Sequence, residues 1–185
     1  MHLRPDEFLL LTPELVKIHL AAMDYPPGIF DSRLRAWRSD RLKPGFHAVV
    51  ATHDSEVLGV AYGFLGDPAY WWDRQLRHAL RGLPSASQPK IDLNEGYFEV
   101  AEIHVHPDYQ GAGIGRRLIT ALLDGAPAHL ALLSTPEVAG EHNAAFGLYR
   151  SLGFFDVLRH HYYESDPRAF AILGAWLPLA SSSGL

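Results

Sequence analysis

The stretch Gln110-Gly111-Ala112-Gly113-Ile114-Gly115 decides how this chain folds, because it links a strand-like run at residues 97–105 to a helix-like run at 114–123. Its closely spaced glycines allow a tight turn and let a ligand approach the main chain. The helix that follows would present unpaired N–H groups with a partial positive charge at the end of this loop. The pattern therefore predicts a phosphate- or pyrophosphate-binding loop, with Arg116 and Arg117 as cationic donors nearby.

Two other glycine-rich phosphate loops do not match the stretch. The dinucleotide-binding fingerprint needs glycine or alanine at its sixth position, where a count from Gly111 reaches Arg116. The Walker loop ends in Gly-Lys-Ser/Thr, which the stretch lacks. The alternative to phosphate binding is a turn whose glycines only close a strand-to-helix corner.

Two motifs in this chain resemble the GNAT N-acetyltransferase superfamily. The first is similar to the family's acyl-CoA signature and reads Gln110-x-x-Gly113-x-Gly115, with Ile103-His104-Val105-His106-Pro107 before it and Arg116-Arg117-Leu118 after it. The second resembles the family's later helix and the strand after it, and reads Asn143-Ala144-Ala145-Phe146-Gly147-Leu148-Tyr149-Arg150-Ser151-Leu152-Gly153-Phe154. Together with the strand between them they cover residues 97–163, whereas the N-terminal half matches in general pattern only.

The resemblance implies an α/β protein with the GNAT acyl-CoA N-acyltransferase fold. This fold has a mixed, mostly antiparallel central sheet that splays between two parallel strands, with helices on both faces. We expect one N-acetyltransferase domain at residues 1–180 and a flexible tail at 181–185. Residues 66–96 form a long connection, of a length that is usually functional or disordered. Its aromatic pair, Trp71 and Trp72, favours either a substrate lid or a lid packed on the core.

Local patterns predict most of the remaining elements. A first helix is expected from Pro13, with Thr12 as its N-cap. The other expected elements are a helix at 31–41, a hairpin of strands at 46–51 and 57–63, a short helix ending at Leu80, a strand at 130–134 parallel to 97–105, and a terminal strand pair at 154–163 and 169–177.

Composition excludes several classes of protein. The chain has 185 residues, 48% of them hydrophobic, which fits one domain with a full core. The lack of cysteine excludes disulfides, thiolate-zinc sites and cysteine nucleophiles. A formal charge of −5 argues against a duplex nucleic-acid surface, and the apolar runs are too short to span a membrane. We therefore expect a cytoplasmic protein with no nucleic-acid or membrane partner, and a homodimer is compatible with the family.

The cofactor that the resemblance implies is acetyl-CoA. It assigns the pyrophosphate contact to backbone donors at residues 111–116, and the pantetheine and thioester contact to the main chain of Ile103 and Val105. The full set of expected cofactor-binding residues is Ile103, His104, Val105, Gln110, Gly111, Ala112, Gly113, Ile114, Gly115, Arg116, Asn143 and Phe146.

Acetyl transfer to an amine needs a base for the amine proton and is helped by an acid for the leaving thiolate. Glu99 and Glu102 are the candidate bases, on opposite faces of a regular strand. Glu99 ranks first because it stands six positions before Val105, where some family members carry a glutamate base. Glu102 can serve instead through a water, and either can be a paired strand carboxylate. The resemblance makes Tyr149 the acid, against the plainer interpretation of a core tyrosine, and Asn143 either caps the same helix or bonds the cofactor.

The acceptor is not defined by a motif. Tyr25, Tyr62, Asp67, Trp71 and Trp72 would make an aromatic, mildly acidic pocket suited to a cationic amine. A small-molecule amine and a peptide amine, at an N-terminus or a lysine, remain open.

Histidine is frequent, but its spacing favours no metal site. The chain has eleven histidines, which lack a zinc-protease pattern and cysteine partners. We interpret them as surface or half-buried residues and expect no metal.

The sequence thus predicts an N-acetyltransferase that moves an acetyl group from acetyl-CoA to a primary amine by direct attack in a ternary complex. The alternative is a non-catalytic acyl-CoA-binding or sensing domain that keeps the loop and lacks the base.

Overall fold

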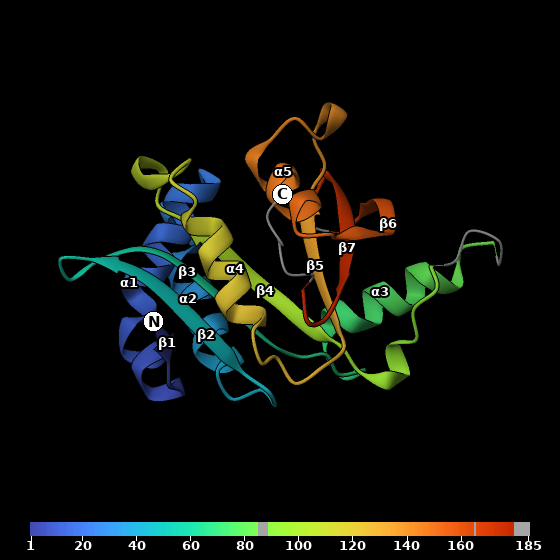
Figure 1. The fold of residues 1–185 in the computed structure, drawn as a ribbon, viewed down its shortest axis with the longest axis horizontal. Coiled ribbons are helices and arrows are strands. Elements are labelled where there is room, and N and C mark those ends of the chain that lie inside the picture. Colours follow the sequence, from blue (N-terminus) through green and yellow to red (C-terminus); the bar gives the residue numbers. More distant parts are fainter. Residues whose placement is uncertain (85–88, 165, 180–185) are drawn as a thin grey trace, which may run out of the picture. The chain divides into compact units, whose positions relative to one another are not determined.

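The computed structural model describes residues 1–84, 89–164 and 166–179, so the expected tail at 181–185 lies outside the described part. Its strands hydrogen-bond in the order β1-β2-β3-β4-β5-β7-β6, which confirms a mixed, mostly antiparallel sheet (Figure 1). The chain forms two compact units that divide strand β4 (Phe98–Val105) between them. The first unit holds Met1–Leu65 and Val100–Pro127, and the second holds Gly66–Glu99 and the chain from Ala128 onward. A single functional domain over residues 1–180 stays a prediction.

The first unit is built on the predicted hairpin. Strands β2 (His47–His53) and β3 (Glu56–Leu65) pair antiparallel, and short β1 (His2–Leu3) adds to β2. The connecting residues Asp54 and Ser55 have positive φ values of 45° and 74°, the conformation that matches a tight hairpin to the strand twist.

Helices cover both faces of this hairpin. Helices α1 (Pro5–Met23) and α4 (Ile114–Leu123) both pack on β2 and β3, and α2 (Phe30–Asp40) packs on α1. Seven consecutive residues of β3 are buried, rather than every second one, so neither face of this strand is open to solvent. The predicted helices at 31–41 and 114–123 are confirmed, the first within one residue at each end.

The prediction that α1 begins at Pro13 is wrong. The helix begins at Pro5, with Asp6 and Glu7 in its first turn, and the Arg4 N–H donates to Glu7 at 2.8 Å. Thr12 is fully buried inside the helix, where its hydroxyl donates to the Phe8 carbonyl at 2.6 Å. A proline removes one helical hydrogen bond, and here burial of the apolar side of α1 against the sheet outweighs that loss.

The second unit contains the rest of the sheet. Strand β5 (Leu130–Pro136) runs parallel to β4, with Phe98 opposite Ala131 and Glu99 opposite Leu132. Strand β7 (Ala169–Trp176) pairs antiparallel with β5 and with β6 (Phe155–Tyr162). These pairings confirm the predicted parallel neighbour and terminal strand pair.

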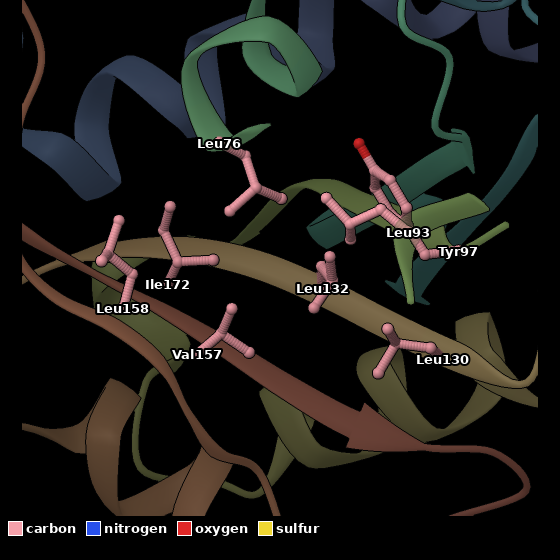
Figure 2. Packing of buried hydrophobic residues seen from close by; sticks show 8 residues of the cluster. All are labelled: Leu76, Leu93, Tyr97, Leu130, Leu132, Val157, Leu158 and Ile172. Atoms are coloured by element: carbon pink, nitrogen blue, oxygen red, sulfur yellow. The ribbon is translucent and has the colours of Figure 1, made fainter. Parts of the chain in front are cut away.

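Helix α3 (Trp71–Arg81) joins the core of this second unit. Figure 2 shows the core cluster, in which Leu76 of α3 faces the sheet; its members are Leu76, Leu93, Tyr97, Leu130, Leu132, Val157, Leu158 and Ile172. Asp73 on the same helix is fully buried and accepts hydrogen bonds from Arg77 at 2.6 Å and the Tyr97 hydroxyl at 2.9 Å. The described part of the long connection is therefore folded structure, and its role as a lid stays a prediction.

Candidate active site

The predicted phosphate loop has the backbone that its glycines suggested. Gly111 and Gly113 have φ values of 79° and 74°, a left-handed conformation that disfavours any side chain. A Cβ added to either glycine would meet no atom within 4 Å, so the main chain here is open to an approaching group. Gly113 is the N-cap of α4 and no side chain caps this helix end. The loop thus offers backbone N–H donors at a helix N-terminus, as an anionic phosphate requires.

The flanking residues hold this loop against β4. The Gln110 side chain donates to the carbonyl of Val105 at 3.1 Å, and the His106 N–H donates to Leu58 on β3 at 2.8 Å. A Cβ on Gly59 would come within 2.8 Å of the His104 carbonyl, so glycine is needed for the close approach of β3 to β4. The Ile114 side chain is buried, whereas Arg116 is exposed at the start of α4. Ile114 can therefore reach a ligand only through its main chain.

The first unit also brings Glu102 and His104 of β4 together with a residue of α1. The Glu102 carboxylate accepts from His104 Nε2 at 2.6 Å, and the same nitrogen lies 2.9 Å from Nδ1 of His19. Burial lowers the pKa of His19 to about 4, against the opposing charge of Glu102. Burial raises the pKa of Glu102, but the hydrogen bond from His104 and the neighbouring positive charges outweigh it and leave the pKa below its usual value. Glu102 is thus a stabilised carboxylate and a weakened base.

Aromatic rings surround this group. Tyr25 packs edge-on against His19, with ring centroids 5.5 Å apart, and Trp37 stacks on His104 at 6.3 Å. Tyr62 is 1% exposed and donates from its hydroxyl to Asp40 at 2.9 Å. Of the predicted acceptor residues, Tyr25 therefore lies beside the Glu102 group, and Tyr62 is a core residue.

Glu99 belongs to the second unit and is 9% exposed. Its charge adds to burial in raising the pKa values of Tyr97 and Tyr163 above that of a free phenol. The structure thus places the two candidate bases in different surroundings, Glu99 near phenols and Glu102 in contact with imidazoles.

Trp71 and Trp72, at the start of α3, both contact Tyr163. The Trp72 indole N–H donates to the Tyr163 hydroxyl at 2.8 Å, and that hydroxyl donates to Ser134 at 2.9 Å. Trp71 is 51% exposed and its ring lies 5.4 Å from that of Tyr163. Asp67 is exposed and accepts from the Ala69 N–H at 2.7 Å, which closes the turn before α3. Two of the predicted acceptor residues therefore share a partner that the sequence did not suggest.

Helix α5 (Ala144–Ser151) carries the second predicted motif. Asn143 is its N-cap and accepts from the Phe146 N–H at 2.8 Å, which confirms the capping alternative for this residue. The Phe146 ring is fully buried, with the guanidinium groups of Arg150 and Arg159 within 6 Å of its centre. Tyr149 is 6% exposed. The placement of Tyr149 fits both alternatives for it, a core tyrosine and a buried acid.

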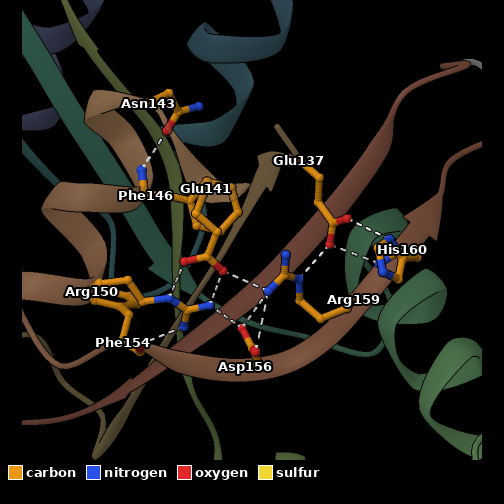
Figure 3. Close-up of polar contacts among 9 residues, drawn as sticks. All are labelled: Glu137, Glu141, Asn143, Phe146, Arg150, Phe154, Asp156, Arg159 and His160. Atoms are coloured by element: carbon orange, nitrogen blue, oxygen red, sulfur yellow. Dashed lines mark hydrogen bonds and ion pairs between the residues drawn. The ribbon is translucent and has the colours of Figure 1, made fainter. Parts of the chain in front are cut away.

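An ion-pair network fixes the segment that leads into α5 (Figure 3). Arg150 donates to both carboxylate oxygens of Glu141, at 2.9 and 2.6 Å, and to Asp156 at 2.6 Å. The Arg159 guanidinium donates to the Glu141 carboxylate at 2.8 Å and to the Glu137 carboxylate at 2.6 Å, and so links the two. The guanidinium of Arg150 lowers the pKa of Glu141 to about 2. These bridges position the Asn143 cap and, through it, the start of the helix that carries Tyr149.

Sequence reasoning missed His19, Asp73 and Tyr163. Each is buried or half-buried and bonded to residues far away in sequence, such as the pair of His19 with His104, 85 positions apart. A polar residue on the buried side of an amphipathic helix was the available signal for His19 and Asp73. Tyr163 had no local signal.

Comparison with known proteins identifies the family. The profile of the Acetyltransferase (GNAT) family matches residues 14–154, so the chain belongs to the GNAT acetyltransferases and is an enzyme of that class. Over an alignment 202 positions long, gaps included, it is 36% identical to a GCN5-like protein acetyltransferase of Mycobacterium tuberculosis, and the alignment covers 96% of this chain and 97% of the relative. A 68-residue match at 51% identity to the N-alpha-acetyltransferase RimI of the same organism covers 36% of this chain and 41% of that protein.

Solved structures agree on the fold. A GNAT-family protein from Desulfovibrio desulfuricans superposes with a TM-score of 0.63 at 17% identity, over 95% of this chain and 96% of its own. A Salmonella typhimurium protein solved with acetyl-CoA as its cofactor superposes with a TM-score of 0.59 at 21% identity, over 91% and 90% of the two chains. The family uses acetyl-CoA, and the open glycine backbone before α4 fits the diphosphate of that cofactor. Among the described residues, no helix is long and apolar enough to span a bilayer.

Proposed function

We propose that this acetyltransferase transfers the acetyl group of acetyl-CoA to a primary amine of a protein, by direct attack in a ternary complex. Binding of acetyl-CoA is supported above all by one observation: no side chain caps the N-terminus of α4, and the main chain of Gly111 and Gly113 just before it is open. The near full-length relative, a protein acetyltransferase by name, supports a protein acceptor over a small amine. Of the two acceptors that the sequence left open, a small-molecule amine and a peptide amine, we thus favour the peptide amine.

The cofactor contacts follow from the chain's own groups. The N–H groups at residues 111–116 would bind the diphosphate, and the main chain of Ile103 and Val105 would align the thioester arm. Acetyl-CoA would supply the activated acyl group, and one preorganised donor aimed at a developing oxyanion contributes about 3 kcal/mol in acyl-transfer enzymes that have an oxyanion hole.

Glu99 is the base that we favour. The amine must lose a proton as it attacks, and a useful base has a pKa close to the working pH. Glu102 is a poorer choice, because its bond to His104 lowers its pKa and ties up one carboxylate oxygen. In the alternative route, a water molecule passes the amine proton on to Glu102. Tyr149 is the proposed acid for the departing thiolate, since its hydroxyl is that of a buried phenol.

The test is acetyl transfer to two peptide pools, one with its N-termini blocked and one with its lysines blocked, read by mass spectrometry. Glu99→Gln should lower kcat by at least about 100-fold, the range of general acid–base catalysis, while the affinity for acetyl-CoA stays within about twofold. Glu102→Gln is the matched control on the same strand, and equal losses in both variants would contradict the assignment. A chain that binds acetyl-CoA and modifies neither pool would favour the acyl-CoA-binding or sensing function instead.

A further inference from the structure

Three side chains in the core of the first unit turn their ligand atoms toward one another. His19 comes from α1, and Glu102 and His104 stand two positions apart on β4, so that both project from the same face of the strand. His19 is 2% exposed, His104 is 9% exposed, and the Glu102 side chain is 18% exposed. These are two imidazoles and one carboxylate, a set of groups that binds divalent transition metals.

Hydrogen bonding alone does not satisfy this arrangement. His104 Nε2 lies 2.6 Å from Glu102 Oε2 and 2.9 Å from His19 Nδ1, yet one ring nitrogen carries at most one proton. The two contacts therefore compete for a single N–H. His19 Nε2, on the far side of its ring, is buried without a hydrogen-bond partner among the described residues. His104 Nε2 cannot supply a proton to both of its contacts, and a cation shared among the three side chains would relieve this shortage.

The spacing of the three atoms suits a metal ion. Glu102 Oε2, His104 Nε2 and His19 Nδ1 form a triangle with sides of 2.6, 2.9 and 3.6 Å. A point about 0.9 Å above the plane of this triangle lies about 2.05 Å from all three atoms, which is the bond length of zinc to imidazole nitrogen and carboxylate oxygen. The 2.6 and 2.9 Å sides are shorter than the roughly 3.3 Å that separates ligand atoms around tetrahedral zinc, so these two contacts would lengthen as an ion enters, and water can complete its coordination.

We propose that His19, Glu102 and His104 form a binding site for one divalent first-row metal ion, with Zn²⁺ as the reference ion. A divalent cation would neutralise the half-buried carboxylate and accept one lone pair from each of the three atoms. The rings of Tyr25 and Trp37 beside the histidines shield the site. The proposal replaces the sequence-based expectation of no metal, and it is independent of the acceptor. A bound ion would also occupy Glu102, leaving Glu99 as the base.

The test is a calorimetric titration of the 185-residue, chelator-treated protein with Zn²⁺ alone. One tight site per chain is expected. Changes to residues that only orient the ligands of a metal already cost about 10–100-fold in affinity, so His19→Asn and Glu102→Gln, which remove ligands, should each weaken binding by at least about 100-fold. His53→Asn is the matched control, because His53 is an exposed histidine beside Asp54 and should leave the affinity unchanged.

A second readout does not depend on the variants. Co²⁺ added to the wild-type protein should give visible absorption bands with the intensity of nitrogen and oxygen coordination, and Zn²⁺ should displace them. A wild-type chain that binds Zn²⁺ no better than the His19→Asn variant, or that shows no Co²⁺ bands, would overturn the proposal. Binding that His53→Asn weakens as much as His19→Asn does would overturn it too, as surface adsorption.

Discussion

Substitution of Gly113 by valine separates a ligand-binding loop from a mere turn. Gly113 has φ 74°, and a residue with a side chain in this left-handed region costs about 1–2 kcal/mol of folding free energy. For a chain of this size that cost lowers the melting temperature by about 2–8 °C. Stabilities of 5–15 kcal/mol are typical, so the variant should stay folded at 25 °C.

The same valine should abolish tight cofactor binding. A Cβ at Gly113 points into open space beside the N-terminus of α4, where the diphosphate is expected. Hydrogen bonds to a charged group contribute about 1.5–3 kcal/mol each, so displacing two backbone N–H contacts costs about 3–6 kcal/mol. At 1.4 kcal/mol per tenfold, acetyl-CoA should bind more than about 100-fold more weakly, as measured by calorimetric titration.

Gly125 provides the matched control at the other end of α4. Its φ is 76°, and an added Cβ would likewise meet no atom within 4 Å. Gly125→Val therefore carries the same backbone strain about 18 Å along the helix from Gly113. It should lose stability to the same extent and keep its affinity for acetyl-CoA. Equal binding by both variants, or equal loss in both, would refute the assignment of the Gly111–Gly113 backbone as a phosphate site.

Three further outcomes follow from the second unit. Tyr97→Phe removes the hydrogen bond to buried Asp73 and should destabilise the protein by about 1.5–3 kcal/mol in urea unfolding, whereas exposed Tyr162→Phe should change little. The pKa of Glu141 is lowered to about 2, so its stabilising contribution is present above the unfolded-state pKa, near 4.3, and is lost as the pH falls through 2. Glu141→Gln should therefore flatten the dependence of unfolding free energy on pH between these two values. An unchanged dependence would contradict the ion pairing. Asn143→Ala should cost about 1 kcal/mol through loss of the cap, whereas Asn143→Asp should keep both the cap and the KM for acetyl-CoA; a raised KM in the aspartate variant would indicate that Asn143 also contacts the cofactor.

Pro13 shows where a local rule failed. Proline favours the first turn of a helix, so Thr12-Pro13 predicts a helix start. The helix begins eight residues earlier and continues through the proline. Burial of Phe8, Leu15 and Val16 against the sheet decides this, and a helix rule confined to neighbouring residues does not include it.

The two glutamates show the same limit within the candidate site. The alternation of side chains along a strand predicts that Glu99 and Glu102 lie on opposite faces, but it does not predict which residues surround each of them. The contact of Glu102 with His104 and His19, and the nearness of Glu99 to two phenols, depend on chain segments up to about 85 positions away. The pKa of Glu102 and the order of the candidate bases thus depend on tertiary packing.

The sequence by itself determined the elements whose causes are local: the tight glycine loop before α4, the hairpin joined through Asp54 and Ser55, and the helix that starts at Asn143. Backbone sterics and capping act within a few residues, so they can be predicted from the residues alone. Only the tertiary structure decided the burial of Tyr62, the fold of the described part of the long connection, and the contact of His19 with His104 and Glu102. These depend on which apolar faces pack together, and burial then sets the partners and pKa values of the polar groups enclosed with them.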